Sequence, residues 1–417
     1  MGVLGAARDV PLWRNLPRAR RIFAYLGPAF LVSVGYIDPG NWATDLEAGS
    51  RFGYGLLWVL LSANLMALVL QHLSAKLGLA TGRTYPQVCR DVFPRPLTVF
   101  LWITAEAAAV ATDLAEFLGA ALGFYLLLHI PMLLAALLTA VVVLGILALY
   151  RFGFRGVEFV IIGMLIVIGV AYVYETWLVG PDWPAIASGV FIPRLESDGL
   201  LLAMGMLGAT VMPHNLYLHS GVILSRRRLH DEVHNRLAVR AALVDSAIAL
   251  NLAWLVNSAI VIMAAAAFFS RSLEISSIEA AHETLVPLLG GAAGAAFAVA
   301  LLAAGLSSSV TATLAGQIII EGFLNVKFGL LLRRLITVVP AVLVIATGLD
   351  AYSVLILSQV SLSIQLPFAI VPLIWLTAQR RIMGQFVNTR LTTLLATAVA
   401  GLIVVLNVLL LAQVAGR

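Results

Sequence analysis

About eleven long apolar runs follow one another along the chain, separated by short polar segments. A helix needs about 20 mostly apolar residues to cross a bilayer, so the runs predict membrane-spanning helices, the longer ones tilted or extended. Hydrophobic residues make up 61% of the 417 and charged residues 11%, too few charges for a soluble surface, and the runs are too continuous for alternating barrel strands. The chain is therefore predicted to be an all-α polytopic membrane protein. The predicted spans are 25–49, 54–79, 97–126, 131–150, 157–178, 200–224, 236–268, 289–323, 331–348, 352–378 and 391–413.

Basic residues are concentrated in alternate connecting segments, whereas the opposite set holds few of them. Because short cytoplasmic loops carry an excess of Lys and Arg, residues 1–24 are expected to be a cytoplasmic tail and the C-terminus to lie outside a plasma membrane. This arrangement accounts for a pI near 9.5 without a nucleic-acid partner. The basic segments are 1–24, 76–95, 151–155, 226–240, 327–334 and 380–390, and the opposite set holds Arg51, Arg194, Arg271 and the terminal Arg417.

A single transmembrane domain is expected over 25–417, built of two halves. The longest outside segment, 180–199, separates a first five-helix repeat (25–178) from a second, inverted repeat (200–378), and 391–413 is an additional helix. No tandem repeat, soluble domain or obligatory protein partner is evident. The single Cys89 excludes an internal disulfide and any zinc site built of cysteines.

The first span is interrupted by Asp38-Pro39-Gly40-Asn41. Proline removes a backbone donor and glycine disfavours the helix, so the helix is expected to break there. Unpaired backbone at membrane depth is tolerated only where it lines a cavity or a site. The interruption is therefore a candidate substrate site.

The sixth span has a matching interruption at Met212-Pro213-His214, preceded by glycines. One proline could be a harmless kink. Paired interruptions in the first helices of two halves, however, are the best sequence indication of the site of an inverted-repeat transporter. If the halves are inverted, the two breaks face each other near the midplane.

The groups at the two breaks indicate a metal substrate. Asp38 and Asn41 offer oxygen, Met212 offers a thioether, and carbonyls near Gly35 and Ala209 are freed by the breaks. Soft sulfur favours first-row transition ions over alkali and alkaline-earth ions. The alternative for Met212 is a side chain that fills a gap in the core. Gln359, in the last helix of the second half, is a further candidate.

The third span carries Glu106, Asp113 and Glu116 at spacings that can share one helix face. Buried carboxylates in membranes tend to mark ion or proton pathways, and histidine titrates near neutral pH, so a proton route from His214 through these acids is predicted. The alternative for the acids is a structural ion pair. Arg333 and Arg334, which open the ninth span, could pair with them or anchor the cytoplasmic edge of the helix.

These motifs resemble those of the Nramp family of proton-coupled divalent metal transporters. The likeness includes both breaks, the acidic third span and Gly316-Gln317 of the eighth span, and it extends over about residues 25–410. It implies eleven helices with a LeuT-like inverted five-plus-five repeat. It also implies import of Mn²⁺ and Fe²⁺, with tolerance of Co²⁺ and Cd²⁺, coupled to protons as co-substrate and without a resident cofactor.

By matching position, the resemblance assigns residues to two roles. Two departures from the common pattern are Gly35, where many members carry Ala, and Leu306, where Gln is common. The implied metal ligands are Asp38, Asn41 and Met212, with Gly35, Ala209 and Gln359 joining in particular conformations; the implied proton-pathway and salt-bridge residues are His214, Glu106, Asp113, Glu116, Arg333 and Arg334.

Three other functions fit these residues less well than metal transport does. A symporter of an amino acid or another organic solute on the same fold would favour a small-residue pocket instead of a thioether at the second break. A metalloenzyme using His214 and His219 would need a general base that the intervening residues lack. A pore would be expected to show a repeated selectivity ring, and none is evident. The sequence thus favours a transporter, not an enzyme, and does not rank Mn²⁺ against Fe²⁺.

Overall fold

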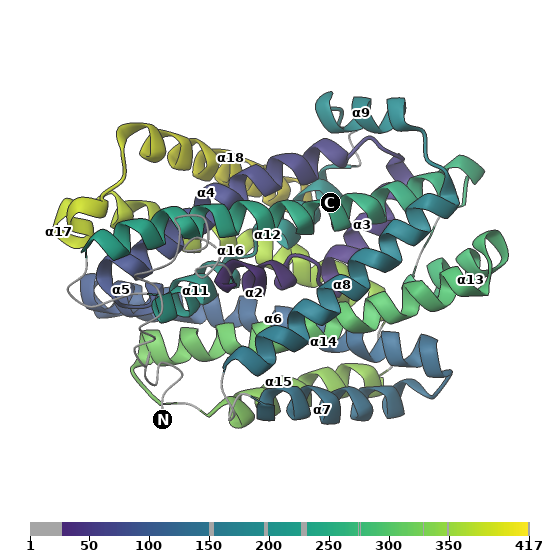
Figure 1. Cartoon of the computed structure of the whole chain (residues 1–417), viewed down its shortest axis with the longest axis horizontal. Coiled ribbons are helices and arrows are strands. Elements are labelled where there is room, and N and C mark those ends of the chain that lie inside the picture. The colour runs from purple at the N-terminus through teal and green to yellow at the C-terminus, as the bar shows by residue number, and fades with distance from the viewer. Residues whose placement is uncertain are drawn as a thin grey trace, which may run out of the picture.

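The computed structural model describes residues 27–149, 154–195, 199–226, 232–273, 275, 277–327, 329–347 and 350–415. The predicted cytoplasmic tail, 1–24, lies outside them. Within the described residues all regular structure is helical, and most of the helices run along the long axis of the molecule (Figure 1). The prediction of an all-α fold is confirmed.

Every predicted span corresponds to one long helix or to a pair of shorter helices separated by a break. The two pairs are the first and sixth spans, as the prolines predict. The spans are α2 (Pro28–Gly35) with α3 (Pro39–Phe52), α4 (Leu57–Thr81), α6 (Arg95–Leu128), α7 (Met132–Leu149), α8 (Phe154–Val179), α10 (Leu200–Val211) with α11 (Pro213–Val222), α12 (Glu232–Ala267), α14 (Gly291–Leu324), α15 (Leu330–Thr347), α16 (Ala351–Thr377) and α18 (Arg390–Ala415).

Seven helices of the described chain are long and apolar enough to cross a membrane by themselves. They are α4, α6, α8, α12, α14, α16 and α18. The two broken pairs are excluded because each half is short. α7 forms a shorter apolar helix, and α15 carries Arg333 and Arg334 near its start.

Four short helices lie in the connecting segments: α5 (Tyr85–Val92), α9 (Trp183–Phe191), α13 (Ile278–Leu289) and α17 (Arg380–Met383). None was predicted, because helices this short and of mixed polarity do not form a long apolar run. The predicted eighth span, 289–323, begins two residues before α14, because Leu289 ends α13 and Gly290, with a φ of 96°, turns the chain into α14.

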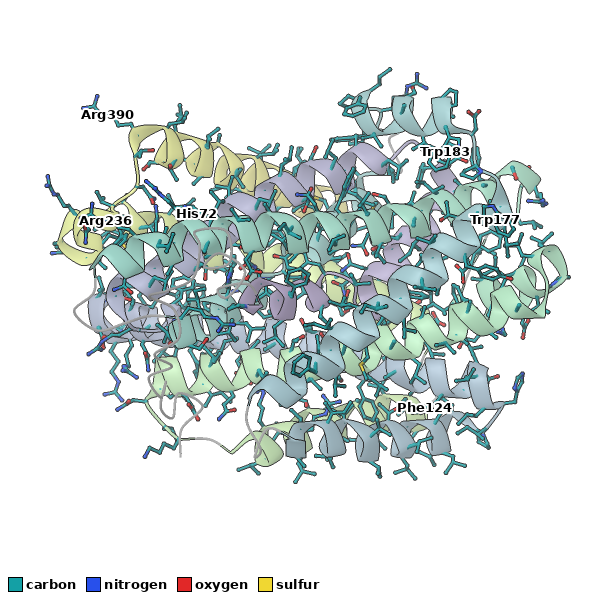
Figure 2. The ribbon with its side chains drawn as sticks, in the orientation of Figure 1. His72, Phe124, Trp177, Trp183, Arg236 and Arg390 are labelled. Atoms are coloured by element: carbon teal, nitrogen blue, oxygen red, sulfur yellow. The ribbon has the colours of Figure 1, made fainter. Side chains whose placement is uncertain are left out.

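The two ends of the molecule differ in their residues. α5 and α17, in the basic connecting segments, lie at one end, and α9 and α13 lie at the other (Figure 1). Arg236 and Arg390 share the first end, whereas Trp177 and Trp183 lie at the second (Figure 2). Tryptophan is enriched at membrane interfaces and arginine in cytoplasmic loops, so the asymmetry agrees with the alternation seen in the sequence.

The centre of the bundle is packed through small residues. α6 and α14 lie side by side, and a Cβ on Gly305 would stand 2.4 Å from the backbone nitrogen of Ala120. A Cβ on Gly123 would stand 2.6 Å from Cα of Leu302. Close approach at small residues is typical of helices in membranes. α6 also packs closely on the first break, since a Cβ on Gly119 would stand 2.0 Å from Cβ of Pro39.

Candidate metal site and the charged cluster beside it

The first break lies between α2 and α3. Pro39 has no N–H, so it cannot donate to the carbonyl of Gly35 four residues earlier, which is the bond that would continue the helix. Asp38 instead caps α3, since its side chain accepts from the backbone N–H of Asn41 at 2.9 Å and from the Asn41 side-chain amide at 2.7 Å. The break thus places a carboxylate at the start of α3.

The second break lies between α10 and α11 and has the same cause. Pro213 stands four residues after Ala209, whose carbonyl is freed in the same way. Met212 lies between the helices with φ 38° and ψ 98°, a conformation that a non-glycine residue rarely adopts. Strained backbone of this kind concentrates at functional sites.

The two breaks contact each other directly. The side-chain amide of Asn41 also donates to the carbonyl of Ala209, at 3.1 Å. Gln359 on α16 donates to the second oxygen of Asp38, at 3.4 Å. Asp38, Asn41, Ala209 and Gln359 are all 0% exposed. Four of the six predicted metal ligands are therefore joined by hydrogen bonds at the centre of the bundle.

Met212 and Gly35, the other two predicted ligands, both lie against Asn215 on α11. The Asn215 amide contacts the sulfur of Met212 at 3.4 Å, and a Cβ on Gly35 would stand 2.5 Å from the same nitrogen. Gly35 thus leaves room for Asn215 beside the first break. Asn215 was not predicted as a site residue. Its place two residues after Pro213 is the only signal that the sequence carries.

Three amide oxygens at the breaks have no hydrogen-bond partner among the described residues. They are Oδ1 of Asn41, Oδ1 of Asn215 and Oε1 of Gln359. Buried polar atoms are normally paired, and an unpaired oxygen at membrane depth is costly unless a ligand completes it. The described chain holds no group of three or more His, Cys, Asp or Glu arranged for a metal. A cation between the two breaks would therefore be bound by one carboxylate, by amide and backbone oxygens, and by the thioether.

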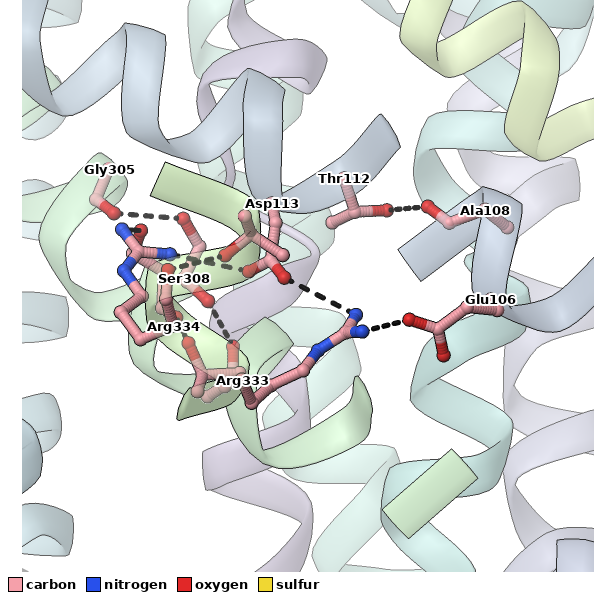
Figure 3. Close-up of polar contacts among 12 residues, drawn as sticks. Glu106, Ala108, Thr112, Asp113, Gly305, Ser308, Arg333 and Arg334 are labelled. Atoms are coloured by element: carbon pink, nitrogen blue, oxygen red, sulfur yellow. Dashed lines mark hydrogen bonds and ion pairs between the residues drawn. The ribbon is translucent and has the colours of Figure 1, made fainter. Parts of the chain in front are cut away.

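Beside the site, two arginines of α15 are buried in ion pairs with α6 (Figure 3). Arg333 pairs with Glu106 and also lies 3.6 Å from Asp113, and Arg334 lies 3.4 Å from Asp113. Arg334 also donates to Ser309 of α14 at 2.8 Å. Because Arg333 and Arg334 are 1% and 0% exposed, they pair with the acids and do not anchor a membrane edge.

Glu116 and His214 link this charged cluster to the breaks. Glu116 is fully buried, has no hydrogen-bond partner in the described chain, and interacts electrostatically with Asp113, Asp38 and Arg334. His214 contacts the Thr112 hydroxyl through Nδ1 at 3.3 Å. All six residues predicted for the proton pathway lie on α6, α11 and α15. Glu116 interacts electrostatically both with Asp38 at the first break and with Asp113 of the charged cluster.

Comparison with known proteins places the chain in a family. The model of the family Nramp, natural resistance-associated macrophage protein-like, matches residues 29–413. A protein of Caldanaerobacter subterraneus subsp. tengcongensis named divalent metal cation transporter MntH is 47% identical over 94% of this chain and 93% of its own length. The protein of the same name from Deinococcus radiodurans is 48% identical over 95% of this chain and 91% of its own.

Solved structures agree. The manganese transporter of Eremococcus coleocola superposes with a TM-score of 0.86 at 35% identity, covering 97% of this chain and 88% of that one. Mhp1, a nucleobase-cation symporter, and MhsT, solved with L-phenylalanine, superpose with TM-scores of 0.61 and 0.59 at 15% and 16% identity, which shows a shared LeuT-like fold alone. The predictions of a transporter fold and of the family are confirmed: the chain belongs to the Nramp family.

Proposed function

We propose that this protein is a proton-coupled importer of divalent transition-metal ions, Mn²⁺ and Fe²⁺ foremost and Cd²⁺ and Co²⁺ by tolerance, that works by alternating access. The family and the names of the relatives support transport of a divalent metal. The observation that carries the proposal is the contact between the two breaks, where Asp38, Asn41 and the Ala209 carbonyl meet beside Met212.

In the proposed mechanism the metal takes over contacts that the site now makes within itself. Asn41 turns its amide toward Asp38 and Ala209 and leaves its oxygen unpaired. An entering ion would be bound by the Asp38 carboxylate and by that oxygen once the amide rotates. The Ala209 carbonyl, released from Asn41, becomes available as well. The ion thus exchanges part of its hydration shell for a few protein ligands. Binding of this kind is weak, which suits a carrier that must release what it binds.

We base the proposed role of the charged cluster on α6 and α15 on charge balance. Asp38 interacts with Glu116, and Glu116 with Asp113, whose charge is opposed by both arginines. When a divalent cation neutralises Asp38, a proton held near it is no longer stabilised and can pass along the α6 acids. Glu106, the acid of α6 whose side chain is partly exposed, would be the residue from which the proton leaves. We infer that this exit faces the cytoplasm, with the N-terminus on the same side of a plasma membrane.

The test is metal uptake by purified protein in liposomes, with the internal pH followed by a dye. Saturable Mn²⁺ uptake with internal acidification, faster at acidic than at neutral external pH, is expected for the wild type. Asp38→Ala should abolish uptake while the protein stays folded. Wild-type liposomes that take up no Mn²⁺ at either pH, or an Asp38→Ala variant that takes it up normally, would contradict the proposal.

A further inference from the structure

The two helix breaks share a four-residue pattern, in which the first residue could bind metal, the second is proline and the fourth is asparagine. The pattern is Asp38-Pro39-Gly40-Asn41 at the first break and Met212-Pro213-His214-Asn215 at the second. In both, the first residue is the N-cap of a helix, proline opens that helix, and the asparagine lies in its first turn. Asn41 is a predicted metal ligand, whereas Asn215 was not predicted as a site residue.

The two asparagines also make the same contact. At the first break the side-chain amide of Asn41 donates to the Asp38 carboxylate at 2.7 Å. At the second, the side-chain amide of Asn215 donates to the Met212 thioether at 3.4 Å, and its backbone N–H donates to the Met212 carbonyl at 3.2 Å. The contact to sulfur is longer because a thioether is a weaker acceptor than a carboxylate. Each asparagine thus holds the predicted metal ligand that precedes its helix.

Each asparagine also has an amide oxygen without a partner. Asn41 and Asn215 are both 0% exposed, and Oδ1 of each has no hydrogen-bond partner among the described residues. An amide oxygen can accept two hydrogen bonds, and burying one that accepts none is costly. A cation bound by the oxygen removes that cost.

Gly35 gives the Asn215 side chain its place beside the first break. A Cβ on Gly35 would stand 2.5 Å from Nδ2 and 3.1 Å from Oδ1 of Asn215, so the amide lies directly against the end of α2. A methyl group at this position would force the amide away. Asn215 therefore contacts one predicted ligand residue from each break, Gly35 and Met212.

We propose that Asn215 is a further metal ligand, the counterpart of Asn41 at the second break. The proposal rests on the proposed function. When the Asn215 amide turns over, its oxygen takes the position of the nitrogen, 3.4 Å from the sulfur of Met212. Adjacent ligands of an octahedral ion stand about 3–3.7 Å apart, given metal–oxygen distances of about 2.1–2.6 Å, so one ion can bind this oxygen and the sulfur together.

The added ligand is a neutral oxygen, which differs in its preference from the thioether beside it. Amide oxygen suits Mn²⁺ better than the softer Cd²⁺, whereas the Met212 thioether has the opposite preference. Loss of Asn215 and loss of Met212 are therefore expected to shift the selectivity between Mn²⁺ and Cd²⁺ in opposite directions.

The test is the binding of Mn²⁺ and Cd²⁺ to the purified full chain, measured by isothermal titration calorimetry. Asn215→Ala is expected to raise the Kd for Mn²⁺ about tenfold and the Kd for Cd²⁺ by less, because an oxygen is lost and the sulfur remains. Gly35→Ala should act in the same direction, and the two changes should not add, because both remove the same amide.

Asn215→Asp separates a metal ligand from a residue that only holds the sulfur. The variant keeps an oxygen and adds charge but loses the N–H that donates to Met212. At mildly alkaline pH, where a carboxyl group can release its proton to bind metal, it should bind Mn²⁺ at least as tightly as the wild type. Asn407→Asp is the matched control, since Asn407 is a buried asparagine of α18 whose amide donates to the Ile403 carbonyl at 2.9 Å. It should leave both Kd values unchanged.

Unchanged Kd values in the folded Asn215→Ala variant would overturn the proposal. So would a greater loss of Cd²⁺ binding than of Mn²⁺ binding in that variant, or an Asn215→Asp variant that binds Mn²⁺ as weakly as Asn215→Ala. Failure of the proposed function looks different. In that case Asp38→Ala would leave both Kd values unchanged as well, whereas failure of the present proposal alone would spare the effect of Asp38→Ala.

Discussion

The side-chain amide of Asn41 donates to the backbone carbonyl of Ala209 across 3.1 Å, although the two residues are 168 positions apart. The bond exists because each residue lies at a helix break made by a proline. Pro213 frees the carbonyl of Ala209, and Pro39 begins the helix whose first turn carries Asn41. A single hydrogen bond thus ties the two breaks that the metal would have to bridge.

Met212→Ala is expected to change selectivity more than it changes transport itself. The thioether favours soft and borderline cations, so its loss should raise the Kd for Cd²⁺ at least tenfold, or about 1.4 kcal/mol, and allow Ca²⁺ to compete. Competition of Ca²⁺ with Cd²⁺ for uptake measures this. Met204→Ala, another buried methionine on α10, is the control. Equal discrimination in Met212→Ala and wild type would make Met212 a packing residue.

Asp113→Asn is expected to separate proton entry from metal uptake. The substitution keeps the shape of the side chain but removes the charge that faces Arg333 and Arg334. Breaking a buried pair from one side costs about 3–5 kcal/mol, so a lower melting temperature should accompany the change. Internal acidification per Mn²⁺ transported is the measurement. Acidification at the wild-type ratio would reject Asp113 as part of the proton route.

Gly40→Ala is expected to impair the site by steric conflict. A Cβ at this position would stand 1.6 Å from Nε2 of Gln359, so Gln359 would have to leave Asp38. Overpacking of this kind costs about 1–3 kcal/mol. Uptake of Mn²⁺ should fall strongly in Gly40→Ala and recover in part when Gln359→Ala is added. A double variant no better than Gly40→Ala alone would show that the conflict lies elsewhere.

Asp350→Ala is expected to destabilise α16 without altering the residues of the candidate metal site. Asp350 caps that helix by accepting from the backbone N–H of Ser353 at 2.8 Å. Hydrogen bonding with the Ser353 side chain, and to a smaller extent with the backbone N–H groups of Ser353 and Tyr352, lowers the pKa of the carboxyl. Loss of a cap costs about 1 kcal/mol. Because the folded pKa is the lower one, the stabilisation is present above the unfolded value, about 3.9, and is lost as pH falls through the folded pKa.

Thermal unfolding of the wild type and Asp350→Ala as a function of pH tests this cap. The two melting temperatures should differ at neutral pH and converge in acid. A difference that stays constant down to strongly acidic pH would mean that the carboxylate charge does not contribute to the cap.

The sequence predicted the spans and both breaks because the signals are local. Long apolar runs mark the helices, and Pro39 and Pro213 mark the interruptions. Asn215 was missed because a lone asparagine inside a helix does not reveal what faces it. The role of Arg333 and Arg334 stayed open for the same reason, since a helix end alone does not show whether an arginine is buried.

X-ray absorption by protein loaded with less than one equivalent of Cd²⁺ tests most directly whether the metal lies between the two breaks. The wild type is expected to show one sulfur neighbour together with oxygen and nitrogen, and Met212→Ala to show oxygen and nitrogen alone. A wild-type spectrum without sulfur, or a sulfur neighbour that persists in Met212→Ala, would place the metal elsewhere in the molecule.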